Sequence, residues 1–340
     1  MKRHVVVLGA TIALALSAGT ALATPGSGIT SVDLARGTSA AAYTITGAAN
    51  TDVATQTNTF APGGSTSGWH THPGPVVTIV QSGTLSLWFS SDCTLRTLTA
   101  GQAIVVPGGG LFDLGRNESA TVPLVLVQTF YNVAIGGPLR TDAPAAQCSV
   151  AVPAVPQDMA VVGVTGVLHA RARMTPAVNI TGAANTDLFI QQLSGVAGAT
   201  TGWHSHPGPV TVLVNSGALT YVHSDCTTSP YPSGTAFIDP GAGNVHLARN
   251  DGTTPTIFFA TYTNLPVGGA ARIDAAAPAC ALAAAATPTP APAASALPNA
   301  ASGSVETGPS TTALALAALL VLASVTSLGF IVAAQRRRRD

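Results

Sequence analysis

Short runs of β-branched and other apolar residues, separated by turns that contain glycine or proline, recur along the middle of the chain. The clearest runs are residues 76–80, 84–88, 103–107, 210–214, 218–221 and 236–240. Gln81-Ser82-Gly83 separates the first two runs, and β-branched segments on both sides of such a turn predict a hairpin. Regular short strands with little helical periodicity predict an all-β fold, either a sandwich or a barrel.

The N-terminus has a different pattern. Lys2 and Arg3 precede an apolar run over residues 5–18, and small residues follow at Ala21 and Ala23. This order predicts a secretory signal peptide over residues 1–23. An uncleaved membrane anchor is the alternative, for which the apolar run is short.

The C-terminus carries a longer apolar stretch without any charge, residues 313–334, followed by four arginines at 336–339. As a helix, 22 residues would rise about 33 Å, enough to cross a hydrocarbon core. A basic cluster stays on the cytoplasmic side, so the chain before the helix is expected outside the cell. The alternative is a buried globular helix, which the lack of any polar face disfavours.

The segment before this helix, residues 281–312, is rich in alanine, proline, serine and threonine and predicts an extended stalk. Stalk, helix and arginine tail together resemble the C-terminal sorting signal of surface proteins in Gram-positive bacteria. That signal contains Leu-Pro-x-Thr-Gly. Here Leu297-Pro298 and Thr307-Gly308 are separated halves. Retention by the helix is therefore expected, and the cell wall is a second candidate partner.

Charge adds little. Charged residues make up 8% of the 340 residues and the formal net charge is +0. Outside the arginine tail there is no basic stripe, so nucleic acid is not expected as a partner. The sequence indicates neither a particular oligomeric state nor a particular small-molecule ligand.

The central part of the chain is an internal repeat. Residues 45–52 recur unchanged at 180–187, and residues 68–75 recur at 202–209 with one substitution. Two copies of this length suit two compact domains. Each copy holds one early and one late cysteine, which favours disulfides Cys93–Cys148 and Cys226–Cys280 in an exported chain.

Each copy also contains a His-x-His pair, His70 and His72 in the first and His204 and His206 in the second. On a strand, residues two apart face the same side, so each pair offers two imidazoles to one centre. Two such imidazoles are half of a metal site. Trp69 and Trp203 face the opposite side and are expected to pack in the core.

The spacing of these pairs resembles the cupin superfamily, and the duplication resembles a bicupin. In both copies His-x-His is followed by a glycine, Gly83 or Gly217. A second glycine then lies six residues before a proline, Pro107 or Pro240, and an asparagine follows, Asn117 or Asn250. The resemblance spans about residues 32–148 and 161–280 and implies two tandem double-stranded β-helix (jelly-roll) barrels with a metal inside. The expected organisation is 1–23 signal peptide, 24–148 cupin domain 1, 149–160 linker, 161–280 cupin domain 2, 281–312 stalk, 313–334 transmembrane helix and 335–340 cytoplasmic tail.

The glutamate ligand of the cupin motif is replaced by Val76 and Val210. The resemblance then leaves His204, His206 and His246 in domain 2, the stronger candidate, and His70, His72 and Asp113 in domain 1. Such donors suit Zn, Mn, Fe, Ni or Cu. The alternatives are a barrel that keeps its histidines without metal and an Asp113 that caps a turn.

Two functions remain open at this point. One is a surface metalloenzyme acting on a small molecule, with His223 and Asp239 as weak candidates for a general base. The other is a non-catalytic surface module that binds a small molecule or metal. A purely structural wall protein is disfavoured by the retained histidines, and His169 is expected to be structural or at the surface. Fold alone does not decide among these.

Overall fold

The computed structural model of the protein describes residues 25–148 and 154–281. The regular secondary structure of these residues is β-strand, apart from one helical turn at 279–281. The all-β prediction is therefore confirmed for them. None of their helical structure is long and apolar enough to cross a membrane. The expected signal peptide, transmembrane helix and basic tail, and nearly all of the expected stalk, lie outside the described residues.

The first repeat folds into two sheets around one core. Strands β8, β5, β10 and β3 are neighbours in one sheet, and β11, β4, β9, β6 and β7 form the other. Apolar side chains of both sheets, such as Phe60, Leu87 and Phe130, meet in a shared core. The strands of this repeat are β1 Ser27–Ser39, β2 Tyr43–Gly47, β3 Thr51–Phe60, β4 His70–Thr71, β5 Val76–Ser82, β6 Thr84–Phe89, β7 Arg96–Thr99, β8 Gln102–Val106, β9 Phe112–Arg116, β10 Leu124–Val133 and β11 Thr141–Asp142.

The second repeat reproduces this order, with β19, β16, β21 and β14 as neighbours and β18, β17, β20, β15 and β22 following one another. It has its own core, which includes Leu219, Phe237 and Phe258. Its strands are β12 Val164–Met174, β13 Val178–Gly182, β14 Thr186–Thr200, β15 His204–Ser205, β16 Val210–Ser216, β17 Ala218–His223, β18 Thr228–Pro232, β19 Thr235–Asp239, β20 His246–Arg249, β21 Thr256–Leu265 and β22 Ile273–Asp274.

The strands predicted on both sides of the Ser-Gly turns are present. Gly83 stands between β5 and β6 with a φ of 79°, a backbone conformation that favours glycine. A Cβ at this position would lie 2.5 Å from the carbonyl oxygen of Pro123. Gly217 occupies the matching place with a φ of 70°. The recurrence of glycine in both copies therefore has a steric cause.

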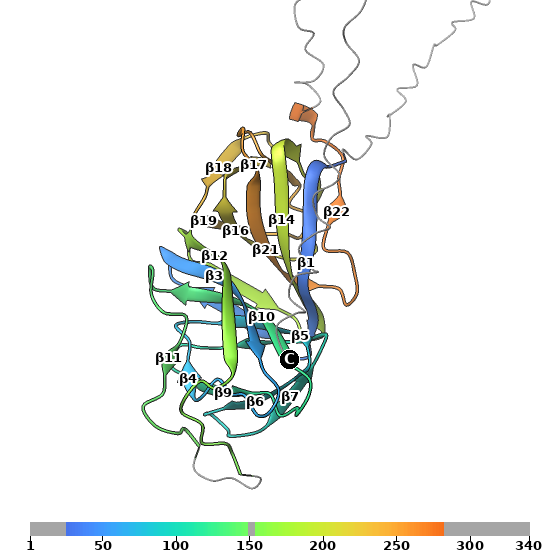
Figure 1. The fold of residues 1–340 in the computed structure, drawn as a ribbon. Helices are drawn as coiled ribbons and strands as arrows, with labels where there is room; N and C mark the ends of the chain where they lie inside the picture. The colour runs from blue at the N-terminus through green and yellow to red at the C-terminus, as the bar shows by residue number, and fades with distance from the viewer. Residues whose placement is uncertain (1–24, 149–153, 282–340) are drawn as a thin grey trace, which may run out of the picture. The chain divides into compact units, whose positions relative to one another are not determined.

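The two repeats exchange their first strands. Strand β1 of the first repeat pairs antiparallel with β14 of the second, from Ser27 to Ser39. Conversely, β12 of the second repeat pairs antiparallel with β3 of the first. Figure 1 shows β1, in blue, running beside β14. Each repeat is thus completed by a strand that the sequence places in the other copy.

A third core lies where the repeats meet. It contains side chains from both copies, among them Ile79, Tyr131, Ile190 and Leu213. The Tyr131 hydroxyl donates a hydrogen bond to Oγ1 of Thr211 at 2.9 Å. Both repeats belong to one compact unit, and this shared core accounts for it.

Polar contacts reinforce the same junction in a symmetrical way. Asp187 of the second repeat accepts from Nε of Arg36 at 2.7 Å, and Asp52 of the first accepts from Nε of Arg173 at 2.9 Å. Asp52 and Asp187 are matching positions of the repeat. His169 also acts here, because its Nε2 lies 2.7 Å from Oγ1 of Thr57 and its ring stacks on Phe259. Its role is structural.

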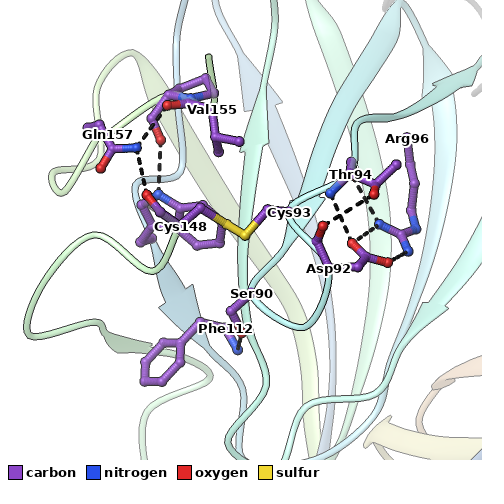
Figure 2. The surroundings of a disulfide bond; sticks show 11 residues. Ser90, Asp92, Cys93, Thr94, Arg96, Phe112, Cys148, Val155 and Gln157 are labelled. Carbon is purple, nitrogen blue, oxygen red and sulfur yellow. Dashed lines mark hydrogen bonds and ion pairs between the residues drawn. A yellow bond between two sulfur atoms is a disulfide. The ribbon is translucent and has the colours of Figure 1, made fainter. Parts of the chain in front are cut away.

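Disulfides join Cys93 to Cys148 and Cys226 to Cys280, the pairing expected from the repeat. Cys93 follows β6, and its bridge fastens the end of the first repeat beside the turn held by Asp92 and Arg96 (Figure 2). Gln157 donates to the carbonyl oxygen of Cys148 at 3.1 Å. Residues 156–158 are therefore held against the first repeat before β12 begins.

Candidate metal centres

The first candidate centre lies where β4 meets β9. His70 and Asp113 are direct partners across these antiparallel strands, so their side chains project from the same face. His72 follows two residues after His70 and joins them. The three side chains are buried, and one ligand atom from each lies within 4.8 Å of the others. The structure thus brings together the three residues proposed for domain 1.

Both histidine rings of this centre are oriented by backbone carbonyls. Nδ1 of His70 donates to the Gly68 oxygen at 2.9 Å, and Nδ1 of His72 donates to the Leu139 oxygen at 2.8 Å. A neutral imidazole has one N–H, so Nε2 of each ring carries a lone pair. The two Nε2 atoms lie 3.1 Å apart. This arrangement of fixed tautomers and converging lone pairs is the one that metal-binding histidines adopt.

The carboxylate of Asp113 completes the set. Its two oxygens lie 3.6 Å from Nε2 of His70 and 3.7 Å from Nε2 of His72. Asp113 Oδ2 is buried and has no hydrogen-bond partner among the described residues. A buried carboxylate oxygen without a partner is costly, and a cation between it and the two lone pairs would satisfy all three atoms. The donors present therefore fit a divalent metal.

Burial sets the protonation of this centre. Burial, and then the neighbouring His72, lower the pKa of His70 well below its usual value. Burial lowers the pKa of His72 to about 4, although its bond to Leu139 opposes the shift. Burial also raises the pKa of Asp113 to about 8, against the opposing charge of Arg140. Both imidazoles are thus neutral at pH 7, as metal ligands must be.

The second centre occupies the matching place, where His204 of β15 pairs with His246 of β20. His206 joins them, and the three buried rings have ligand atoms within 4.8 Å of one another. Each Nδ1 donates to a backbone oxygen: His204 to Gly202 at 2.8 Å, His206 to Ala271 at 2.7 Å and His246 to Asn244 at 3.0 Å. The Nε2 atoms are again free to bind a metal.

A carboxylate stands behind His246 in this centre. Asp239 Oδ2 lies 2.9 Å from Nδ1 of His246, and the Tyr221 hydroxyl donates to the same oxygen at 2.5 Å. Burial alone would raise the pKa of Asp239, but the bond and charge of His246 and the Tyr221 bond lower it on balance to about 2. A carboxylate behind a ligating histidine raises the basicity of that ring. Asp239 therefore supports a ligand and is not placed as a free general base.

Burial also suppresses protonation of the second set. It lowers the pKa of His204 to about 2, with further contributions from His246 and His206. Burial lowers the pKa of His206 as well. His223, the other candidate base, bonds to Oγ of Ser229 at 2.9 Å through its Nε2 and does not line the cavity beside the three histidines. The sequence-based roles of His223 and Asp239 as bases thus find no geometric support.

The valines at the usual glutamate positions are buried in the apolar cores of their repeats. Trp69 is also fully buried, as expected, with its indole N–H donating to the Pro156 oxygen at 3.0 Å. Each centre is therefore limited to the three protein ligands already described, leaving positions for an exogenous ligand. Among the described residues, no fourth donor of the histidine, cysteine or carboxylate type joins either group.

The cavities beside the two centres differ in size. In the first repeat the cavity measures about 230 Å³ and includes His70, His72 and Asp113 in its wall. The matching inner cavity of the second repeat measures about 50 Å³, because Tyr221 and Tyr262 replace Leu87 and Phe130 and Phe258 replaces Leu126. A wider cleft of about 680 Å³ reaches His204 and His206 from outside, beside β1.

Sequence reasoning missed the polar residues that line the first cavity, namely Gln56, Asn58, Thr78, Gln128 and Arg140. A signal for them existed, because Gln56 and Asn58 are two residues apart on a strand and hence face the same side. Polar residues at the inward positions of a strand indicate a polar cavity wall. Most of the matching positions in the second copy have no polar residue.

Comparison with known proteins agrees with this architecture. Residues 57–130 match the sequence profile of the cupin domain. A search of curated proteins finds no significant match. Among solved structures, a tryptophan variant of oxalate decarboxylase from B. subtilis is 13% identical, with 72% of this chain and 78% of that chain covered and a TM-score of 0.34.

Two further structures are similarly distant. AerE from Microcystis aeruginosa is 12% identical over 62% of this chain and 86% of its own, with a TM-score of 0.26. A cupin 2 conserved barrel domain protein from Leptotrichia buccalis is 11% identical, with 72% of this chain and 92% of that chain covered and a TM-score of 0.25. Such similarities do not indicate a shared activity. Residues 57–130 therefore form a cupin domain.

Proposed function

We propose that this cupin binds one divalent metal ion in each repeat, at His70, His72 and Asp113 and at His204, His206 and His246. The observation that carries the proposal is the contact of His70 Nε2 with His72 Nε2 at 3.1 Å, with both Nδ1 atoms already committed to carbonyls. Two lone pairs at this distance repel unless a cation lies between them. The nitrogen and oxygen donors suit zinc, manganese, iron, nickel or copper.

The second repeat is the stronger metal site in this proposal. Its three ligands are imidazoles with fixed orientation, and Asp239 supplies a negative charge behind His246. The first repeat has the larger inner cavity of the two and is the better place for a small molecule inside the fold. A bound metal would polarise an oxygen atom of such a molecule. The role of the chain is to hold the metal, exclude water and orient the ligand.

Whether the first cavity catalyses a reaction is a separate question, and one observation favours binding without turnover. The titratable residues that line this cavity are His70, His72, Asp113 and Arg140. The first three are the proposed ligands, and an arginine does not deprotonate in proteins. Among the described lining residues no independent general base remains. A non-catalytic module that captures a small molecule is therefore the second candidate function, beside a metal-dependent enzyme.

We also propose that the protein is exported and held at the outer face of the membrane. The two disulfides support this, because such bonds persist in oxidising compartments. The apolar residues 313–334 and the arginine run would supply a single-pass anchor with a cytoplasmic tail. A chain that ends before residue 313 should be released into the medium, whereas the full chain should stay with the membrane after alkaline extraction. Release of both chains would reject the anchor.

Metal content tests the central proposal. The full chain, purified with its disulfides intact, should contain close to two metal equivalents by elemental analysis. His70→Ala/His72→Ala and His204→Ala/His206→Ala should each lose one of them, and His223→Ala, whose ring bonds to Ser229, should keep both. A wild-type protein that stays free of metal after incubation with divalent ions would reject the proposal.

A further inference from the structure

One wall of the first cavity is a chain of hydrogen-bonded amide side chains. Nε2 of Gln56 donates to Oδ1 of Asn58 at 2.7 Å, and Nδ2 of Asn58 donates to Oε1 of Gln128 at 2.6 Å. Nε2 of Gln128 then donates to Oγ1 of Thr78 at 2.9 Å. All four side chains line the cavity. Gln128 and Thr78 are buried and Gln56 and Asn58 are half-buried, so this polar wall is built into the domain.

The chain of bonds leaves further amide donors unused in the wall of the cavity. Each primary amide has two N–H groups, and the bonds above use one from each of the three amides. One N–H of each amide is therefore available for another acceptor. Gln128 is buried and Gln56 and Asn58 are half-buried, and amide donors in such a cavity wall favour an oxygen acceptor such as a carbonyl, carboxylate or hydroxyl.

The charge near the proposed metal points to the other end of the ligand. Arg140 lines the same cavity, and its NH1 group donates to the Ser67 oxygen at 2.8 Å. The Arg140 guanidinium is paired with Asp142, so the positive charge of the cavity would come from a divalent metal with one carboxylate ligand, Asp113. Such a cavity favours an anion. The remaining lining is apolar and includes Phe60 and Phe130.

The second repeat has lost this wall. By the register of the strands, Asn58, Thr78 and Gln128 correspond to Leu193, Val212 and Ala260. Only Gln56 has a polar counterpart, Gln191, whose Nε2 donates to Asp33 instead. The amide wall is therefore not needed to build a domain of this fold. The amide wall lies beside one of the two centres only, and we therefore infer that it has a role in binding there.

We propose that the first repeat binds a small organic anion whose carboxylate lies at His70, His72 and Asp113 and whose second oxygen accepts hydrogen bonds from Gln56, Asn58 and Gln128. The inference rests on the proposed metal site, which supplies part of the positive charge. A cavity of about 230 Å³ has room for a molecule on the order of ten non-hydrogen atoms. The apolar lining packs against the body between the two polar ends.

Benzoate and its meta and para hydroxy derivatives test whether the amides bind a second oxygen of the ligand, because each derivative has one oxygen more than benzoate. We expect calorimetric titration of the metal-loaded full chain to show at least one hydroxybenzoate binding about tenfold more tightly than benzoate. Asn58→Leu and Gln128→Ala, alone and combined, introduce the residues of the second repeat and should abolish this advantage. Gln191→Ala is the matched control in the second repeat and should preserve it.

Metal content, measured on each protein before titration, separates the possible failures. A wild-type protein without metal would overturn both the proposed function and this inference. A metal-loaded protein that binds no benzoate derivative at millimolar concentration would overturn the inference alone. The inference alone would also be overturned if neither hydroxybenzoate bound more tightly than benzoate. An advantage that survives in a metal-loaded Asn58→Leu/Gln128→Ala variant with wild-type melting temperature would also overturn it.

Discussion

Asp239 lies 2.9 Å from Nδ1 of His246, whereas Asp113 of the first repeat occupies the place of His246 itself. Both centres thus contain a carboxylate, among the ligands in one repeat and behind a ligand in the other. The partner of Asp239 is Tyr221, and the first repeat has Val106 and Leu87 at these two positions. Different residues of the two copies therefore place a carboxyl group beside the histidines.

Loss of the charge behind His246 should weaken the second site alone. Asp239→Asn removes the carboxylate that fixes the ring and raises its basicity, and such changes commonly lower metal affinity by about 10–100-fold. Competition with a chelator of known affinity would measure the effect. The first site provides the control within the same molecule, and an equal loss there would show a general folding defect.

Metal removal should destabilise the protein. Ions that bind only the folded state stabilise it by about 2.7 kcal/mol at a hundredfold excess over Kd. We expect chelated protein to melt at a lower temperature and to recover on addition of zinc. The His70→Ala/His72→Ala and His204→Ala/His206→Ala variants should each recover less than wild type. A melting temperature that is independent of metal in all three proteins would argue against occupied sites.

The exchanged strand β12 should control the amide wall. A Cβ on Gly166 would lie 2.8 Å from Nε2 of Gln56 and 2.9 Å from Oδ1 of Asn58. Gly166→Ala should therefore displace these amides and reduce binding of the hydroxybenzoates by calorimetry. We expect metal content to remain unchanged. Ser31→Ala, at the matching position on β1, should leave binding in the first repeat intact.

The junction of the repeats should be sensitive to acid. Burial would raise the pKa of Asp187, but bonds from Thr38 and Gly268 and the Arg36 guanidinium lower it on balance. A carboxyl whose pKa is lower in the folded than in the unfolded state stabilises the folded protein at any pH above its unfolded-state pKa, near 3.8. This stabilisation is lost as the pH falls from 3.8 through the folded-state pKa.

Replacement of that carboxyl should therefore remove a pH-dependent contribution. At pH 7, Asp187→Asn should lower the free energy of unfolding by about 1–3 kcal/mol. The difference from wild type should shrink as denaturant titrations approach pH 3. Asp251→Asn, at an exposed ion pair with Arg249, should change stability by less than about 0.5 kcal/mol. A constant deficit for Asp187→Asn across this pH range would contradict the assignment.

The sequence predicted the all-β class, the hairpins at Gly83 and Gly217 and the disulfide pairs, because each of these leaves a local pattern repeated in both copies. It did not predict the exchange of β1 and β12. Strand pairing between copies depends on which partner buries more apolar surface, and the residue pattern of a strand is the same for either partner.

The candidate site was predictable to a similar degree. The two His-x-His pairs named four ligand candidates, the cupin resemblance added Asp113 and His246, and the structure brings these six residues into two groups. The amide wall was not predicted, because Gln56 and Gln128 are 72 residues apart in the sequence and meet only through the register of β3 with β10. The role of Asp239 also escaped, since it depends on the position of His246 across a folded sheet.

The most direct test is a crystal structure of the full chain with anomalous scattering measured at the absorption edge of its bound metal. We expect two anomalous peaks per chain, one about 2.0–2.3 Å from Nε2 of His70 and His72 and the other at the same distance from Nε2 of His204, His206 and His246. Absence of both peaks from a metal-supplemented crystal, or peaks away from these Nε2 atoms, would contradict it.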